Sequence, residues 1–390
     1  MSRFLFITLP LPGHLNPMAA VAGELTRRGH EVAWAGSESF LRPVVGEDAT
    51  IFPIPLRAHR GQRDRGMADT KSRWAGYIVP HARSTRKGIE AAVEAFRPEV
   101  LAVDQHAIAA AVIAHKAGLR WASIAPTTME LTRPLAALPK VEAWIGDRMA
   151  EIWAEAGMPG VPPHDLRFSP HLLIAFTGRA LVGASPVPEN AKLVGPALAQ
   201  RPQDPPFPWE WLDSRRQQVL VSVGTLSMDI SDSFYQRVVD ALRPLADRLQ
   251  AIVVATDAAV PDPPEHLLVR TRVPMLELLP KVSAVVSHGG LNTVCEALYH
   301  GVPLIITPIK GDQAINAKQV AEAGAGLRIS FDRASADELR AALLTVLDDP
   351  AFRKSAQQVG ESFAAAGGVT AAAVHLEQLS LAVFPVDSAA

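Results

Sequence analysis

A proline-rich stretch divides this chain into two halves that repeat one pattern, and it constrains the fold more than any other feature. Within residues 195–216, the run Arg201-Pro202-Gln203-Asp204-Pro205-Pro206-Phe207-Pro208 resists regular structure and predicts a stiff linker. On both sides of it, short β-branched runs alternate with helical stretches. This alternation is typical of parallel sheets covered by helices. The sequence therefore predicts an α/β fold of two Rossmann-like, doubly wound parallel-sheet domains that face each other across a cleft.

The same pattern predicts the domain boundaries. We expect a first domain over residues 1–200, a linker over 201–216, a second domain over 217–375, and a tail over 376–390 with the option of crossing back to the first domain. The strands expected in the two halves are Phe4–Leu9, Glu31–Ala35, Val100–Val103 and Trp121–Ala125, then Val219–Val223, Ala251–Ala255, Leu267–Val269, Ala284–Ser287 and Leu304–Thr307. The helices expected are Met18–Arg28, Lys87–Phe96 and Ala107–Ala117, then Phe234–Leu245, Leu291–Tyr299, Ala314–Ala323, Ala336–Asp348 and Ala351–Ala365. Residues 56–80 predict a long loop, because they are rich in Arg, Gly and His without a clear period.

Composition excludes several classes of protein. A length of 390 residues is typical of two domains. A net charge of −2 argues against nucleic-acid or membrane-surface binding. The only cysteine, Cys295, has no partner for an internal disulfide, which favours a reducing, cytoplasmic compartment. No apolar run reaches the roughly 18–20 residues of a membrane span, and Met1–Leu11 predicts a buried strand and not a signal peptide.

The turn from Ser287 to Thr293, with the sequence Ser-His-Gly-Gly-Leu-Asn-Thr, points to an anion site. It joins the apolar run Ala284–Val286 directly to a helical segment. Such a turn presents backbone N–H groups and the positive end of a helix dipole, and His288, Asn292 and Thr293 add side-chain donors. We therefore predict a phosphate-binding turn. The alternative is a histidine at a helix start that binds no ligand.

Two further side-chain sets suggest that the phosphate belongs to a sugar nucleotide. Glu296 lies one turn into the helix, where a carboxylate suits the two hydroxyls of a ribose. The 2′-hydroxyl exists in UDP and not in dTDP, so Glu296 favours a UDP-sugar. Asp312 and Gln313 follow another strand and suit sugar hydroxyls. The alternatives are a solvated Glu296 and an Asp312 that caps a helix.

In the first half, His14 and Asp104 form a candidate acid–base pair. His14 lies between the first strand and its helix, where the helix dipole favours neutral imidazole, as a general base requires. Asp104 ends another strand, so both side chains are expected at one sheet edge, where the carboxylate would orient the ring. A capping histidine and a turn aspartate are the alternatives. No spacing typical of a metal site or of a dinucleotide fingerprint is present, so we predict no metal.

These motifs together resemble the family 1 glycosyltransferases, which are inverting, metal-independent enzymes of the GT-B fold. The resemblance rests on the segment from Ser287 to Leu298, on Gly301-Val302-Pro303 and Asp312-Gln313, and on Gly13-His14-Leu15-Asn16-Pro17 in the first half. Gly195-Pro196, Trp209-Glu210-Trp211-Leu212 and Val221-Ser222-Val223-Gly224-Thr225 also match the family pattern.

The resemblance implies a role for each matching position. His14 would deprotonate the acceptor and Asp104 would orient His14. The diphosphate would be held by Gly224, Thr225, His288, Gly289, Gly290, Asn292 and Thr293. Glu296 would bind the ribose, Asp312 and Gln313 the donor sugar, and the Val273 backbone the base. Met275 stands where the family commonly has Gln, and the C-terminal block departs from the plant-type signature.

The resemblance implies an inverting O-glycosyltransferase with no tightly bound cofactor. It would move a hexose, glucose being favoured, from a UDP-sugar to a hydroxyl of a hydrophobic natural product such as a macrolide, ansamycin or aromatic polyketide. A dTDP-sugar is the less favoured donor. Candidates for the acceptor-site wall are Trp74, Tyr77, Met129, Leu135 and Trp144. The alternatives are a UDP-sugar epimerase or cell-wall hexosaminyltransferase on the same fold, and a non-catalytic ligand-binding or auxiliary protein.

Overall fold

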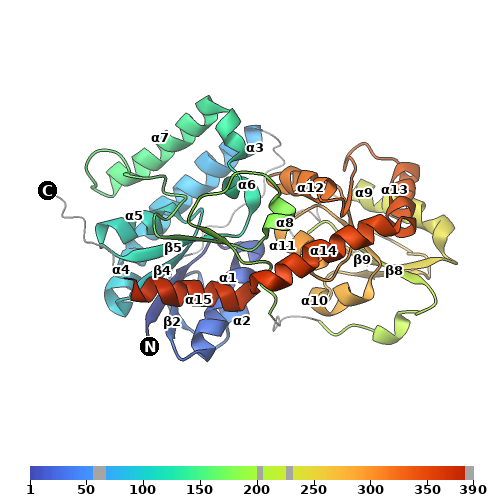
Figure 1. The fold of residues 1–390 in the computed structure, drawn as a ribbon, viewed down its shortest axis with the longest axis horizontal. Helices are drawn as coiled ribbons and strands as arrows, with labels where there is room; N and C mark the ends of the chain where they lie inside the picture. Colours follow the sequence, from blue (N-terminus) through green and yellow to red (C-terminus); the bar gives the residue numbers. More distant parts are fainter. Residues whose placement is uncertain (56–66, 200–204, 225–231, 383–390) are drawn as a thin grey trace.

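Two parallel β-sheets, each covered by helices, form two lobes that lie side by side (Figure 1). The computed structural model describes residues 1–55, 67–199, 205–224 and 232–382. The seven-stranded sheet of the first lobe has the order β3-β2-β1-β4-β5-β6-β7, and the six-stranded sheet of the second lobe has the order β10-β9-β8-β11-β12-β13. In both sheets the order reverses beside the first strand of the lobe, which defines a doubly wound sheet. The predicted fold class is confirmed.

The strands of the first lobe are β1 (Arg3–Ile7), β2 (Glu31–Gly36), β3 (Thr50–Pro53), β4 (Val100–Asp104), β5 (Arg120–Ala125), β6 (Leu172–Ala175) and β7 (Ala191–Leu193). The strands of the second lobe are β8 (Gln217–Ser222), β9 (Leu249–Val254), β10 (Leu267–Arg270), β11 (Ala284–Ser287), β12 (Leu304–Ile306) and β13 (Gly326–Arg328).

The helices that follow the first-lobe strands are α1 (Pro12–Arg27), α2 (Glu38–Val45), α3 (Met67–Arg73), α4 (Val79–Phe96), α5 (Ile108–Lys116), α6 (Thr128–Leu131), α7 (Pro139–Glu155) and α8 (Arg179–Val182). Those of the second half of the chain are α9 (Asp232–Leu242), α10 (Met275–Leu278), α11 (Leu291–Tyr299), α12 (Gln313–Glu322), α13 (Ala336–Asp348), α14 (Pro350–Ala366) and α15 (Gly368–Leu381). A short 3₁₀-helix, Trp209–Trp211, precedes the second sheet.

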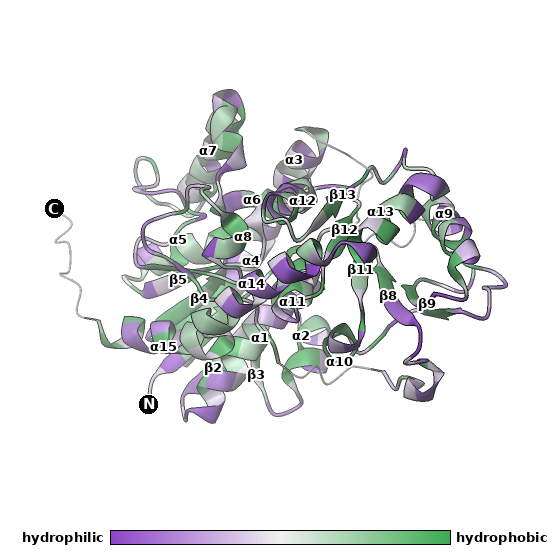
Figure 2. Cartoon of the chain, turned by 45° about the vertical axis from the view of Figure 1, so that its right-hand side comes forward, coloured by the Kyte–Doolittle hydropathy of each residue, from purple (hydrophilic) through white to green (hydrophobic). Residues whose placement is uncertain are grey.

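The central strands are apolar on both faces because helices cover both sides of each sheet. Every residue of β4 and β11 is buried. Figure 2 shows these strands as hydrophobic, whereas the outer faces of many helices are hydrophilic. This arrangement fixes the carboxyl ends of the central strands, where loops meet at the boundary between the lobes.

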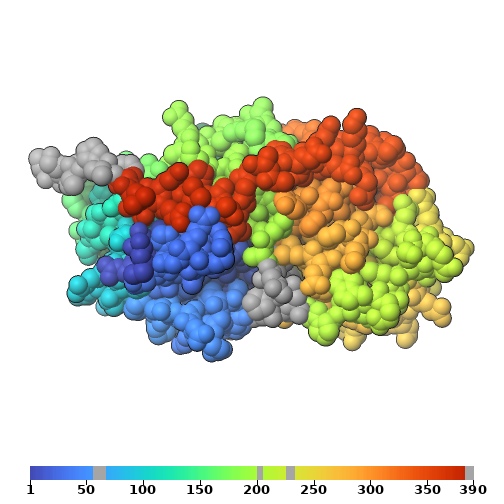
Figure 3. All heavy atoms as spheres, turned by 60° about the horizontal axis from the view of Figure 1, so that its bottom comes forward, coloured from blue at the N-terminus to red at the C-terminus, as the bar shows by residue number. Residues whose placement is uncertain are grey.

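The C-terminal helices bridge the two lobes. Figure 3 shows α14 and α15 as one red band that reaches from the second lobe over α1 in the first. The helix α15 begins at Gly368, so the crossing starts before residue 376. Its Ala372, Ala373, Leu376 and Leu379 are buried in the same cluster as Phe4, Phe6 and Leu15. The C-terminal helix α15 is therefore part of the core of the first lobe.

The expected loop over residues 56–80 is wrong for its second part. The helix α3 continues into a π-helical turn, Trp74–Ile78, and then into α4, so residues 67–96 are helical throughout. Trp74 and Tyr77 are buried in the first-lobe core, and this packing outweighs the weak local helical signal. Residues 56–66 lie outside the described residues.

Docking of α15 should contribute measurably to the stability of the first lobe. Leu376 has no exposed surface, so Leu376→Ala is expected to lower the free energy of unfolding by about 2–5 kcal/mol. Leu381→Ala is the matched control, because Leu381 on the same helix is 77% exposed, and it should change stability by less than about 0.5 kcal/mol. Chemical denaturation followed by circular dichroism measures both. Equal effects of the two variants would contradict the docking of α15.

Candidate functional site

His14 and Asp104 meet at the point where the order of the first sheet reverses. His14 lies in the first turn of α1, just after β1, and Asp104 is the last residue of β4, which pairs with β1. The Nδ1 atom of His14 lies 2.7 Å from Oδ2 of Asp104. His14 is 9% exposed and Asp104 is completely buried. The structure thus brings the two predicted residues together.

The carboxylate of Asp104 accepts several further hydrogen bonds. The backbone N–H of His106 donates to Oδ1 at 2.9 Å, and the backbone N–H of Leu9 donates to Oδ2 at 3.2 Å. Burial alone would raise the pKa of Asp104, but the charge and hydrogen bond of His14, together with His106, lower it to about 2. Asp104 is therefore an ionised acceptor at neutral pH. In the neutral imidazole of His14, the partner atom Nδ1 therefore carries the proton and Nε2 holds the lone pair.

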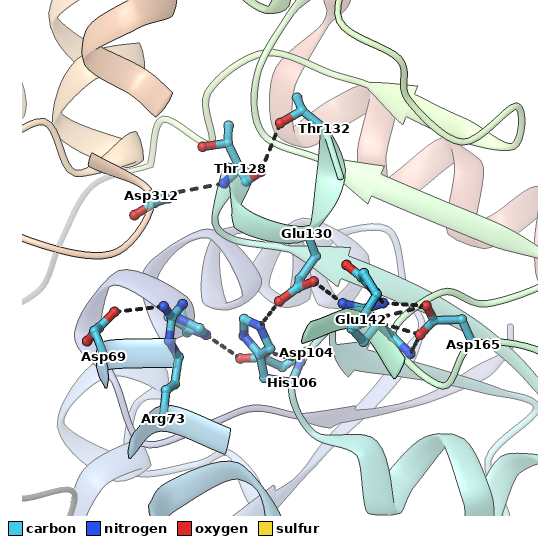
Figure 4. A network of polar contacts seen from close by, with 12 residues as sticks. Asp69, Arg73, Asp104, His106, Thr128, Glu130, Thr132, Glu142, Asp165 and Asp312 are labelled. Atoms are coloured by element: carbon cyan, nitrogen blue, oxygen red, sulfur yellow. Dashed lines mark hydrogen bonds and ion pairs between the residues drawn. The ribbon is translucent and has the colours of Figure 1, made fainter. Parts of the chain in front are cut away.

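A chain of buried charged groups continues behind this pair (Figure 4). The Nε2 atom of His106 lies 3.2 Å from Oε1 of Glu130, and Nη1 of Arg167 donates to Oε2 of Glu130 at 2.5 Å. Burial would raise the pKa of Glu130, but the hydrogen bond from His106 and the charge of Arg167 lower it to about 2. Arg167 also donates to Glu142 and Asp165. This network of charged groups could not be predicted, because its members are far apart along the polypeptide.

Among the described residues, one group offers ligand atoms close enough for a metal ion. These residues are His14, Asp104 and His106, with ligand atoms within 4.8 Å of one another. The Nδ1 of His14 and the carboxylate of Asp104 already bond to each other. The arrangement therefore matches an imidazole of His14 that is oriented by Asp104. The ring of His106 is tilted relative to that of His14, with 6.0 Å between the ring centroids.

In the second lobe, His288 is enclosed by glycine backbone. His288 follows β11, and Gly224 follows β8, the strand that pairs with β11 where this sheet reverses its order. A Cβ atom at Gly224 or at Gly290 would lie only 2.7 Å from the imidazole ring, so only glycine allows this approach. Burial lowers the pKa of His288 to about 4, so its ring is neutral at pH 7. Thr225 lies outside the described residues.

The start of α11 is suited to an anion. Gly290 is the N-cap, no side chain caps the helix, and the first turn holds no acidic residue. The first backbone N–H groups of α11 have no partner within the helix, so they are suited to an anion. Gly289, whose φ is 90°, forms the turn, and Asn292 and Thr293 are half-buried beside it.

Asn292 also connects the two lobes. Its Nδ2 atom donates to the carbonyl oxygen of Gly13 at 2.9 Å. Pro17 lies four residues after Gly13 in α1 and has no N–H, so it cannot donate the usual helical hydrogen bond to that carbonyl. The predicted helix start at Met18 is wrong, because α1 begins at Pro12 and continues through Pro17. This proline leaves the Gly13 carbonyl available to the second lobe.

Glu296 faces the lobe boundary and is only 4% exposed. It lines a small cavity together with Asn292 and Cys295 from α11, and with Asn16 and Phe176 from the first lobe. The predicted ribose residue and one predicted phosphate residue thus share one cavity.

Asp312 and Gln313 follow β12 and begin α12. Asp312 occupies the N-cap position, but its side chain makes no capping hydrogen bond. Its Oδ2 accepts from the backbone N–H of Thr128 in the first lobe at 3.3 Å. The Oε1 of Gln313 accepts from the backbone N–H groups of Ile309 and Lys310, and these bonds fix the orientation of its amide group.

The remaining predicted positions are more ordinary. Val273 is 8% exposed and precedes Met275, the first residue of α10. Trp74, Tyr77 and Leu135 are buried in the first-lobe core, Trp144 packs against it, and Met129 is also buried. The expected acceptor wall is therefore largely core packing.

The chain is similar to known proteins. Residues 241–379 match the family model described as "Erythromycin biosynthesis protein CIII-like, C-terminal domain". The chain is 29% identical to 4′-demethylrebeccamycin synthase of Lentzea aerocolonigenes, over 97% of this chain and 99% of that protein. It is 26% identical to the NDP-glycosyltransferase YjiC of Bacillus licheniformis, over 95% of each.

Solved structures agree in fold over the full length. The glycosyltransferase of kitacinnamycin is 25% identical and superposes with a TM-score of 0.82, over 97% of this chain and 99% of that one. The calicheamicin glycosyltransferase CalG4 is 20% identical, with a TM-score of 0.80 over 99% of this chain and 100% of that one. In the described part of the chain, no helix is long and apolar enough to cross a membrane. The chain is thus similar to the family 1 glycosyltransferases, with a match of the erythromycin CIII-like type over residues 241–379, and it is a glycosyltransferase of the GT-B fold.

Proposed function

We propose that the protein transfers a hexose, glucose being favoured, from a UDP-sugar to a hydroxyl of a hydrophobic natural product, with inversion at the anomeric carbon. One observation carries the proposal: the His14–Asp104 pair and the His288 turn lie on facing lobes, joined by the hydrogen bond from Asn292 to Gly13. A base on one side of the boundary and an anion site on the other are what a single displacement requires.

The reaction follows from these positions. Nε2 of His14 takes the proton of the acceptor hydroxyl as that oxygen attacks the anomeric carbon. The bond from this carbon to the diphosphate oxygen breaks, and its electron pair stays on UDP. Asp104 stabilises the imidazolium that forms, and the N–H groups at the start of α11 stabilise the leaving diphosphate. Gly224, Thr225, His288, Gly289, Gly290, Asn292 and Thr293 hold the diphosphate in this proposal, and Val273 contacts the base.

The donor proposal rests on Glu296. A carboxylate accepts two hydrogen bonds readily, and that of Glu296 lines the same cavity as Asn292 at the helix that would hold the diphosphate. UDP offers a 2′-hydroxyl to such a carboxylate and dTDP does not. Asp312 and Gln313 would bind the hexose hydroxyls through the carboxylate and the amide nitrogen.

The acceptor class rests on similarity. Relatives of this chain include an elloramycin glycosyltransferase and a demethyllactenocin mycarosyltransferase, both from Streptomyces. We propose a macrolide, ansamycin or aromatic polyketide as acceptor, and a cytoplasmic location because the single cysteine, Cys295, is free and buried. An epimerase would act on the UDP-sugar alone, so incubation without acceptor separates that alternative from transfer.

His14→Ala should abolish transfer without abolishing donor binding. Loss of a general base typically costs about 10²–10⁴-fold in rate. We expect such a loss in kcat for glucosylation, measured by mass spectrometry, with UDP affinity changed less than about twofold by calorimetry. His375→Ala is the control, because His375 on α15 lies outside the proposed site and its ring bonds to Gln378, three residues along the same helix. Full transfer activity of His14→Ala would rule out the assigned base.

Glu296→Ala should weaken UDP binding more than dTDP binding. A hydrogen bond to a charged group contributes about 1.5–3 kcal/mol, so UDP affinity should fall by about tenfold or more. Calorimetric titration of each nucleotide measures the difference, and Glu296→Gln, which keeps one acceptor oxygen, should lose less. Equal weakening of the two nucleotides would remove the reason for assigning UDP.

A further inference from the structure

A buried hydrogen bond joins the lobes at a second place. The hydroxyl of Thr128, at the start of α6, donates to Oδ1 of Asn316 in α12 at 2.5 Å. Neither residue has any exposed surface. Figure 1 shows the two short helices next to each other where the lobes meet. A buried polar contact between separate lobes is specific, because each partner would be left unsatisfied if it were broken.

On the second-lobe side, Asn316 holds two parts of the proposed donor site. Its Nδ2 atom donates to the carbonyl oxygen of Gly289 in the phosphate turn at 2.8 Å and lies 3.3 Å from Oδ2 of Asp312. The same carboxylate oxygen accepts from the backbone N–H of Thr128 at 3.3 Å. The orientation of Asp312 is thus set partly by a residue of the first lobe.

On the first-lobe side, α6 is linked to the His14–Asp104 pair through Glu130, two residues after Thr128. Glu130, in the middle of α6, bonds to the ring of His106, and the backbone N–H of His106 donates to Asp104 (Figure 4). Arg167 holds the other oxygen of Glu130. The four-residue helix α6 therefore contacts Asp312, the proposed sugar-binding residue, through Thr128, and His106, which bonds to Asp104, through Glu130.

We propose that Thr128 and Asn316 are positioning residues of the transfer reaction. Their hydrogen bond sets the placement of His14 and the acceptor relative to the donor sugar. This inference rests on the proposed function, in which Asp312 binds the sugar. Misplacement of reacting groups by about 1 Å costs as much as about 10²-fold in rate.

The test removes the hydroxyl and keeps the shape of the side chain. Thr128→Val should lower the ratio of acceptor glycosylation to donor hydrolysis by about 10- to 100-fold, because water adapts to a misplaced donor and a bulky acceptor does not. A purely structural role would lower both reactions by the same factor. Donor affinity, measured by calorimetry, should change less than about twofold.

A mutant cycle shows whether the two residues act through each other. In an Asn316→Leu background, Thr128→Val should cause almost no further loss, because its partner is already absent. Thr128→Ser keeps the donor and should restore the wild-type ratio. Thr132→Val is the matched control, because the buried hydroxyl of Thr132 donates only within the first lobe, to the carbonyl of Thr128.

An unchanged ratio in Thr128→Val, or the same loss in both backgrounds, would overturn the inference. The wild type is assayed first with UDP-glucose and dTDP-glucose. Failure with UDP-glucose and turnover of dTDP-glucose would refute the proposed donor. The cycle is then run with the sugar nucleotide that the wild type uses, so the two proposals fail separately.

Discussion

The buried carboxylate of Asp104 is the group on which the rest of the first-lobe site depends. A fully buried charge is tolerated only if its surroundings supply opposite charge or hydrogen-bond donors. Here the ring of His14 and two backbone N–H groups do so. The consequence for chemistry is direct, because the same carboxylate that must be satisfied also fixes which nitrogen of His14 is free.

Both lobes place their candidate functional residues at the point where the strand order of the sheet reverses. In each sheet the order reverses between two central strands, β1 and β4 in the first lobe and β8 and β11 in the second. The loops after those strands carry His14 and Asp104 in one lobe and Gly224 and His288 in the other. The lobes then meet through polar contacts, Asn292 with Gly13 and Thr128 with Asn316. The site is thus assembled from two separate sheet edges, and its geometry depends on how the lobes close.

The sequence was sufficient for the features that depend on strand ends. His14 and Asp104 were expected at one edge, and the structure places them in contact, because parallel strands present their carboxyl ends together. The link from His106 through Glu130 to Arg167 could not be predicted, because its members lie 24 and 37 residues apart and meet only through packing. Thr128 and Asn316 are 188 residues apart on different lobes. The helix α15 was missed as well, since only its burial against the first lobe gives its apolar residues a partner.

The protonation state of His14 in the ligand-free enzyme tests the central claim most directly. Nitrogen-15 NMR of histidine-labelled protein at pH 7, with the signals of His14 assigned by comparison with His14→Gln, reports which ring nitrogen carries the proton. We predict a proton on Nδ1, hydrogen-bonded to Asp104, and no proton on Nε2. A proton on Nε2 with a bare Nδ1 would contradict this prediction, because the nitrogen that faces the acceptor would then have no lone pair to offer.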